Sequence, residues 1–404
     1  DSHVIGIETN QSSLTISGSV TLKDNATIST DSGNVSLGNL SLGHGNIEVL
    51  GGTLSLAGGD VESNGLIEVG EQGNLDLQGN LTVVGTLDLN NGASINFANN
   101  ATANLSGGQL ELAGSHGLDG ITTNANTTLQ INTSGGISRT DNGTSTVGNL
   151  VLSQAGSSSG VSFGVDNMSL TVGGTAQFND ADITLNRANL DFQSSLTFDN
   201  GSSVDVSNGE LILQNGGTFD NSSVNFSASV FKPSGTVSVT SGGSFTLNDN
   251  SSIVLQGDTT LSQSGTASWP ELDLGGKVLT LDNVSTFTIQ KALNIANGES
   301  LSSRSTDLNL SNTVTIDNGG ELSSGSGDVQ ISGALTLNGE IEQGGGILNL
   351  IKGGTVGATG RLDVSDSELK LGAALNITGT LAANSASKWS GSAGRVDLSA
   401  GTLE

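Results

Sequence analysis

Apolar and polar residues alternate along the chain in short units, apolar–polar–apolar, that are bounded by Gly, Asn and Asp. Three such units begin at Leu54, Leu75 and Ile95, at steps of 21 and 20 residues. Alternation of this kind places the two apolar side chains on one face of a strand and the polar side chain on the other. The pattern therefore predicts short, half-buried strands that recur at a nearly constant interval.

The same interval returns in the middle of the chain and near its C-terminus. One series of units begins at Ile183, Val204, Val224 and Phe245, at steps of 21, 20 and 21 residues. Two later series begin at Phe287, Leu308, Val329, Leu348 and Leu369, and at Leu272, Leu293, Val314 and Leu335. A chain that returns to the same place at each step stacks like units on one another and closes a continuous apolar core.

The interval predicts an all-β fold, a parallel β-helix with coils of about 20–21 residues and roughly 20 coils in the chain. Gly and Asn suit its corners because they accept a positive φ. The chain has only 2 Pro, as expected where most backbone N–H groups bond to the next coil. An antiparallel β-sandwich or barrel also alternates with period two, but it does not explain several series that keep one fixed step.

We expect residues 1–404 to form one elongated β-helix, and the Trp residues indicate tandem superrepeats of about 120 residues. The register breaks around 257–270, a segment that holds Trp269, and similar residues precede Trp389 further on. With the Ser-rich segment 153–159, this indicates breaks near 113–150, 257–270 and 380–395. Each Trp segment is either a ligand loop or a corner insertion that fills the core with an indole, and we expect the second.

The net charge of the chain limits the classes of partner that it can bind. Lys plus Arg number 12 and Asp plus Glu 39, which gives a net charge of -27. So acidic a chain argues against nucleic acid and anionic membrane surfaces as partners, because both attract basic patches, whereas it is compatible with cations, calcium above all.

The absence of Cys excludes disulfides and is typical of bacterial secreted proteins. No stretch approaches the roughly 18 apolar residues of a membrane span, and without a recognisable signal peptide we expect a mature chain or an excised fragment.

Candidate catalytic and metal-binding residues are few. The three histidines, His3, His44 and His116, are far apart in the sequence, and with no Cys a zinc site is not expected. His44 and His116 both stand beside Gly, so we expect solvated turn residues. The sequence contains no nucleophile elbow, phosphate-binding loop or dinucleotide fingerprint. We therefore predict no catalytic residue, no metal site and no cofactor.

Outward carboxylates are the remaining source of chemistry. They are spread along predicted outward strand positions: Asp76, Asp88, Asp191, Asp205 and Asp273. Polysaccharide-cutting β-helices need clustered carboxylates with a basic partner and aromatic platforms for sugar rings. The aromatic residues here are mostly Phe at predicted inward positions, as at Phe192, Phe226 and Phe245. We expect the carboxylates to serve solubility and to block edge association, and the protein not to be an enzyme.

Weaker signals concern calcium, ice and surface modification. The acidic group at 179–182, with Asp180 and Asp182, has oxygens that calcium prefers, but we expect a solvated turn because the calcium-binding nonapeptide and the EF-hand loop are absent. Ice binding is not expected, since outward positions mix residue types without a flat Thr ladder. N-x-S/T triplets occur at Asn34, Asn104, Asn126 and Asn221, among others, and most of them arise by chance in so polar a chain.

The repeats and the composition together resemble a known class of proteins. Segments 51–56 and 85–92 read GGTLSL and GTLDLNNG, and the chain is Gly/Asn-rich, acidic and free of Cys. In this it is similar to the β-helical part of filamentous-haemagglutinin-type two-partner-secretion adhesins and autotransporter passengers. The resemblance covers nearly the whole chain, and its motifs report the solenoid rather than a function. It implies a right-handed helix, in line with the crossover preference of parallel strands, and a secreted or cell-surface location.

The sequence thus predicts a secreted or surface-anchored bacterial adhesin segment, a stiff stalk that mediates adhesion or cell–cell contact in biofilms. Expected partners are host or bacterial surface glycans or proteins, bound by weak multivalent contacts, with the binding residues unknown. One open alternative is a self-assembling extracellular filament or surface-layer subunit, which would self-associate through open end coils. A polysaccharide-active β-helix enzyme is a third, weaker alternative, because stacking brings residues of successive coils close together.

Overall fold

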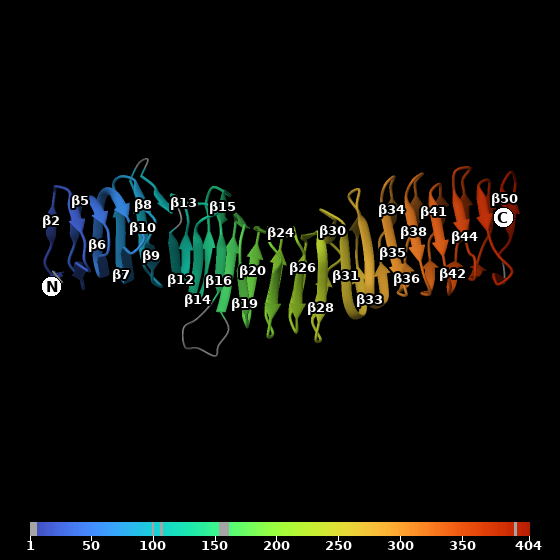
Figure 1. The fold of residues 1–404 in the computed structure, drawn as a ribbon, viewed down its shortest axis with the longest axis horizontal. Coiled ribbons are helices and arrows are strands. Elements are labelled where there is room, and N and C mark those ends of the chain that lie inside the picture. Colours follow the sequence, from blue (N-terminus) through green and yellow to red (C-terminus); the bar gives the residue numbers. More distant parts are fainter. Residues whose placement is uncertain (1–5, 99–100, 106–107, 153–160, 392–393) are drawn as a thin grey trace. The chain divides into compact units, whose positions relative to one another are not determined.

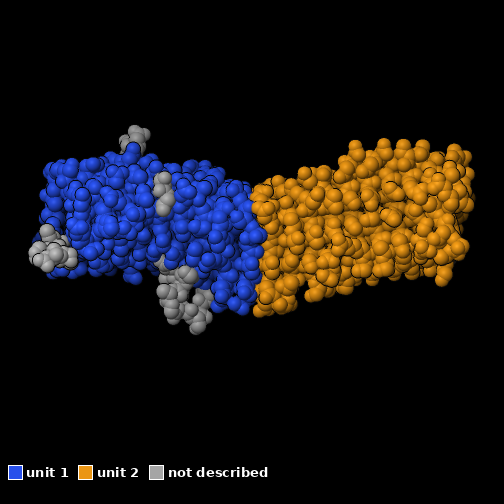
Figure 2. All heavy atoms as spheres, in the orientation of Figure 1, with its two compact units in different colours: residues 1–204 blue, residues 205–404 orange. Residues whose placement is uncertain are grey.

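A computed structural model describes residues 6–98, 101–105, 108–152, 161–391 and 394–404. These residues form short β-strands and turns, with no helix among them. The strands are parallel and stack coil upon coil as a β-solenoid of about 18 turns (Figure 1). The predicted all-β parallel β-helix is confirmed. The chain divides into two compact units, unit 1 (residues 1–204) and unit 2 (residues 205–404; Figure 2), and β23 (Ser203–Ser207) spans the boundary in the sequence.

Unit 1 contains three ladders of parallel strands, and its longest strands take part in more than one of them. The first ladder consists of β1 (Gly6–Glu8), β4 (Thr27–Thr30), β6 (Asn46–Val61), β7 (Leu66–Leu77), β9 (Thr86–Leu89), β12 (Gln109–Gly117), β14 (Thr128–Ser138), β16 (Asn149–Leu152), β19 (Ala176–Asn179) and β22 (Leu196–Asp199). The second adds β2 (Leu14–Ile16), β5 (Val35–Leu42), β10 (Ser94–Phe97), β17 (Val161–Asp166) and β20 (Ala181–Asn186). The third side holds β3 (Val20–Leu22), β8 (Leu81–Val83), β11 (Ala103–Leu105) and β13 (Ile121–Thr123), then β15 (Thr144–Val147), β18 (Ser169–Val172) and β21 (Asn189–Phe192).

Unit 2 has the same plan. Its first ladder consists of β25 (Gly217–Asp220), β28 (Gly235–Thr240), β31 (Thr259–Trp269), β33 (Val278–Ile289), β35 (Ser300–Arg304), β38 (Glu321–Ser324), β41 (Glu340–Gln343), β44 (Arg361–Asp363), β47 (Thr380–Ala382) and β50 (Thr402–Leu403). The second adds β26 (Ser223–Ser227), β29 (Ser244–Leu247), β36 (Asp307–Leu310), β39 (Val329–Ile331), β42 (Ile347–Leu350), β45 (Glu368–Leu371) and β48 (Lys388–Ser390). The third side holds β24 (Glu210–Leu213), β27 (Val230–Pro233), β30 (Ser252–Val254) and β32 (Leu272–Asp273), then β34 (Leu293–Ile295), β37 (Val314–Ile316), β40 (Leu335–Leu337), β43 (Gly354–Val356), β46 (Leu375–Ile377) and β49 (Val396–Leu398).

The strand registers reproduce the interval predicted from the sequence. In unit 1, Leu75 pairs with Leu54 on one side and with Ile95 on the other. In unit 2, Val329 pairs with Leu348 of the following coil. Residues one interval apart are therefore neighbours in a ladder, and inward side chains such as those of Leu54 and Leu75 are fully buried.

One predicted series loses its strand pairing at a single step. The sequence places Leu272 and Leu293 in the same series, but Leu272 lies in the last strand of one sheet, whereas Leu293 pairs with Val314 in the first strand of another. β32 is only two residues long. Pro270, which has no N–H to donate, lies before it, and Gly275, whose φ is 57°, lies after it.

The cores are apolar and in places aromatic. In unit 1 the rings of Phe178 and Phe198 stack with centroids 4.6 Å apart, and Phe192 meets Phe178 edge-on at 5.7 Å. In unit 2 the rings of Phe226 and Phe245 lie 5.3 Å apart. Aromatic pairs of this kind add stability beyond the apolar area that they bury. The predicted inward placement is confirmed for the buried rings of Phe192 and Phe226, and Phe245 faces the same cluster while half-buried.

The segment 257–270 continues the solenoid through an irregular strand. β31 pairs with β28 and with β33, and its register against β33 shifts between Ser262 and Thr266. Trp269 ends this strand, is only 2% exposed, and meets Phe287 edge-on with centroids 4.8 Å apart. The predicted core-filling indole is confirmed at Trp269. For Trp389 the same expectation is wrong, because this residue on β48 is 46% exposed. The segment 153–159 lies outside the described residues, and the superrepeat stays a prediction.

The two Trp residues provide a matched test of this packing. We expect Trp269→Ala to lower the free energy of unfolding by about 3–5 kcal/mol, because it removes a buried ring and leaves a cavity. Trp389→Ala, at an exposed site, should cost less than about 1 kcal/mol. Urea unfolding followed by circular dichroism measures both losses. Equal losses in the two variants would contradict the core role of Trp269.

Candidate functional site

The outward face of the second ladder in unit 2 carries a column of hydroxyl, amide and ammonium groups. Successive residues in this column are paired in register: Ser268, Thr288, Asn309, Gln330, Asn349, Lys370 and Ser390. Neighbouring strands of a sheet lie about 4.8 Å apart, so the polar groups repeat at that spacing. None of them is a carboxylate, in a chain with 39 Asp and Glu. We call these seven residues the amide column.

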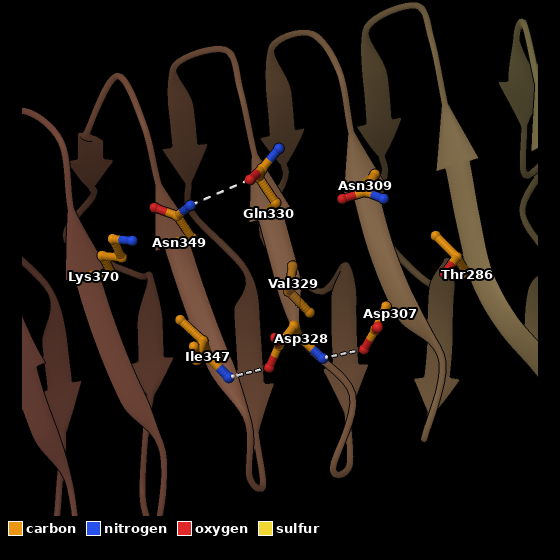
Figure 3. A pocket seen from close by; sticks show the side chains of 9 residues that line it. All are labelled: Thr286, Asp307, Asn309, Asp328, Val329, Gln330, Ile347, Asn349 and Lys370. Atoms are coloured by element: carbon orange, nitrogen blue, oxygen red, sulfur yellow. Dashed lines mark hydrogen bonds between the residues drawn. The ribbon is translucent and has the colours of Figure 1, made fainter.

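A groove of about 220 Å³ lies beside the middle of the amide column. Its lining comes from strands β33, β36, β39, β42 and β45 and from the turn before β39: Thr286, Asp307, Asn309, Asp328, Val329, Gln330, Ile347, Asn349 and Lys370. Figure 3 shows Asn309, Gln330 and Asn349 in one row across the strands, and Asp307, Asp328 and Ile347 in a second row. The groove therefore runs across the strands, from coil to coil.

The two carboxylates of the groove accept hydrogen bonds from backbone N–H groups. The Asp307 carboxylate accepts a hydrogen bond from the backbone N–H of Asp328 at 2.9 Å. The Asp328 carboxylate accepts one from the backbone N–H of Ile347 at 2.8 Å. Each Asp thereby joins one coil to the next, and this edge of the groove is held in place.

The amide row has hydrogen-bonding capacity left for a ligand. Asn349 donates from Nδ2 to Oε1 of Gln330 at 3.3 Å (Figure 3). Gln330 also donates from Nε2 to Oγ of Ser332 at 3.4 Å. A side-chain amide carries two donors and an acceptor with two lone pairs, so these bonds use only part of what each group offers. Lys370 adds an ammonium group at the end of the row. The lining includes no His or Cys, and the arrangement is suited to binding a polar molecule through several hydrogen bonds.

A column of carboxylates lies on the first ladder of unit 1. Glu48, Glu68, Asp88 and Glu111 are paired in register on successive coils, about 4.8 Å apart by the spacing of neighbouring strands. Like charges at that distance repel one another. The alternation of the sequence predicts each residue as outward, but only the register shows that they form one column.

Within this column, Asp88 has a raised pKa. Its carboxyl is half-buried, and burial raises its pKa from 3.8 to about 6, with smaller contributions in the same direction from the charges of Glu111 and Glu68. The folded chain therefore binds a proton that the unfolded chain releases between about pH 4 and pH 6. Stability from this source is complete below the unfolded pKa and is lost as the pH rises through the folded pKa. The expectation that outward carboxylates serve solubility and block edge association therefore leaves out the effect of Asp88 on stability.

The pH dependence of unfolding tests this column. We expect the melting temperature of the protein to be lower at pH 7.5 than at pH 5, and Asp88→Asn to reduce that difference. At pH 7.5 the same variant should raise the free energy of unfolding by about 1 kcal/mol, a value that allows for solvent screening of a half-exposed group. Asp76→Asn is the control, because its paired neighbours are Ser55 and Asn96. The same pH dependence in both variants would contradict the role of Asp88.

His44 and His116, which the sequence predicts as solvated turn residues, differ in their surroundings. His44 is exposed in a turn, and Asn64 Nδ2 lies 3.3 Å from its Nε2, so the solvated turn is confirmed. For His116 that prediction is wrong: it lies on β12, is only 7% exposed, and pairs with the inward Ile137. Its Nε2 is 2.8 Å from the backbone oxygen of Ala113. The neighbouring Gly117 is the last residue of the same strand rather than part of a corner. His3 lies outside the described residues.

The acidic group at 179–182 lies where β19 ends and β20 begins, with Asp180 between the two strands. Asp180 has a φ of 53°. The Asn179 side-chain oxygen accepts a hydrogen bond from Asn200 at 2.9 Å, and the Asp182 carboxylate accepts one from Ser203 at 2.5 Å. These oxygens are used within the solenoid. Among the described residues, no group of three or more His, Asp and Glu is placed to hold a metal ion.

The five aspartates predicted as outward lie at outward strand positions: Asp76, Asp88, Asp191, Asp205 and Asp273. Two of them show the local hydrogen bonds that such residues make. Gln78 donates to Asp76 at 2.7 Å, and Asn225 donates to Asp205 at 2.8 Å. Polar side chains on successive coils or on one strand thus satisfy one another across the outer surface.

The chain matches no protein-family model, no curated protein and no solved structure. In the part of the chain that the structure describes, no helix has the length and the apolar character needed to cross a membrane.

Proposed function

We propose that this chain is a segment of a secreted or cell-surface bacterial adhesin, a stiff stalk with binding surfaces on its outward faces. The observation that carries the proposal is the groove beside the amide column, at Asn309, Gln330 and Asn349. The Gly/Asn-rich, Cys-free and acidic sequence, similar to that of filamentous-haemagglutinin-type adhesins and autotransporter passengers, supports the same function.

The groove favours a ligand rich in hydroxyl groups. A hydroxyl both donates and accepts, and a side-chain amide offers both complements within one planar group. Surface glycans present many hydroxyl groups at short, regular distances. The net charge of -27 opposes polyanionic ligands, so neutral or amino-substituted glycans are the preferred class.

The solenoid supports adhesion through rigidity and repetition. Successive coils are held together by ladders of parallel strands, so outward side chains keep fixed positions. Weak contacts that repeat along one surface raise the overall affinity, because each bound contact increases the effective concentration of the next. An adhesin of this kind needs neither a cofactor nor a deep pocket.

Binding to a broad glycan array, in calcium and then in EDTA, tests the proposal. We expect saturable binding by the purified chain. Since two amide hydrogen bonds are removed, Gln330→Ala combined with Asn349→Ala should weaken binding at the groove about tenfold. The matched control is Thr315→Ala combined with Thr336→Ala, on β37 and β40, whose side chains form a paired outward column on another sheet of the same unit.

Two results would contradict the proposal. Equal binding by the groove variant and the control variant would show that the amide column does not bind the ligand. No binding by the wild-type chain, on an array where control lectins bind, would show that this segment is a spacer without a glycan site.

A further inference from the structure

Besides the groove of unit 2, a hollow lies in unit 1, on the outward face of β12, β14 and β17. Its volume is about 300 Å³, and it is lined by Ser115, His116, Gly117, Gly135, Gly136, Ile137, Ser138, Gly164 and Asp166. Outward residues on these strands are paired in register as Ser115, Gly136 and Gly164. Two successive coils thus lack an outward side chain at the same position, and the hollow lies over them.

The glycines of this hollow differ in what the fold requires of them. At Gly135 and Gly136 a Cβ atom would collide with the backbone oxygen of Gly114 and of Gly164, respectively, so close packing of the coils explains both. At Gly164 a Cβ would meet nothing closer than 3.8 Å, and at Gly117 nothing closer than 3.7 Å. Neither of these two residues has the positive φ that favours glycine. The fold does not need glycine at Gly117 or Gly164, yet both keep the hollow open.

The rim of the hollow carries a carboxylate that is held in place. Asn186 donates from Nδ2 to Oδ1 of Asp166 at 2.8 Å, and the guanidinium of Arg187 lies 3.9 Å from the same oxygen. The side chain of Asp166 remains about half exposed, at 47%. Ser138 on the neighbouring β14 lies in register beside Asp166, and Ser115 is exposed on β12, one strand further along. A flat glycine floor is thus bordered by two hydroxyls and one oriented carboxylate.

We propose that this hollow is a binding site for one ring of a neutral or amino-substituted saccharide. The C–H face of the ring lies on Gly136 and Gly164, and its hydroxyl or ammonium groups donate to the Asp166 carboxylate and bond to the two Ser hydroxyls. The site goes beyond the proposed function, because its residues are all in unit 1 and share nothing with the groove beside the amide column.

Two other classes of ligand fit the hollow less well. An extended peptide binds a sheet by adding a strand to a free edge, but the middle strand of this floor, β14, already pairs with β12 and β17. An anionic ligand would lie against Asp166 in a chain of net charge -27, and like charges repel. A sugar ring needs neither a free strand edge nor a positive charge.

Filling the hollow tests the site directly. The wild-type chain and Gly164→Leu are compared by titration calorimetry against the neutral and amino sugars that bind on the array. We expect Gly164→Leu to weaken binding at least tenfold without changing the melting temperature, because its Cβ has room. Gly18→Leu is the matched control, since a Cβ there also meets nothing within 4 Å and Gly18 lies in a turn of the same unit. Asp166→Asn should weaken amino-sugar binding more than neutral-sugar binding.

The groove variant separates the two sites. Gln330→Ala combined with Asn349→Ala should leave the binding that is lost in Gly164→Leu, and the combination of all three substitutions should abolish both. Unchanged affinity in Gly164→Leu would overturn the site in unit 1, whatever the groove variant shows. Wild-type binding that depends only on Gln330 and Asn349 would overturn it equally, while supporting the proposed function.

Discussion

The parallel pairing of each coil with the next is the interaction on which the rest of this structure depends. A three-residue strand buries two side chains and leaves its backbone groups unpaired unless another strand lies beside it. Stacking meets both needs at once: Leu75 is buried between Leu54 and Ile95, and the same registers supply the backbone hydrogen bonds. Because every coil uses the same solution, the fold tolerates wide variation in its outward residues.

Stacking also makes the outward surface an ordered array of columns. A side chain that would be isolated on another fold meets its equivalents about 4.8 Å away on the coils before and after. Partial burial raises the pKa of Asp88 to about 6, and repulsion by the carboxylates of the same column adds to this rise. Amides bond to one another, as Asn349 does to Gln330. A gap in a column leaves a hollow, as at Gly136 and Gly164.

The strands and their faces could be predicted because both depend on local alternation, which one sequence contains. Errors arose where a local signal had two meanings. Gly117 beside His116 indicated a corner, but it is the last residue of β12. The series through Leu272 and Leu293 kept its spacing, but its ladder ended after β32, a strand of only two residues. The groove and the hollow had no local signal, since their walls come from residues one or more coils apart.

The sequence by itself determined the all-β class, the parallel solenoid, the interval of the coils and the inward residues. The reason is that the apolar side chains to be buried recur at a regular spacing along the chain. Only the tertiary structure decided which outward residues share a column. The steps from Glu68 to Asp88 and from Asp88 to Glu111 differ by three residues, yet both are neighbouring coils. Turns of unequal length absorb that difference, and their length does not affect the apolar pattern that specifies the fold.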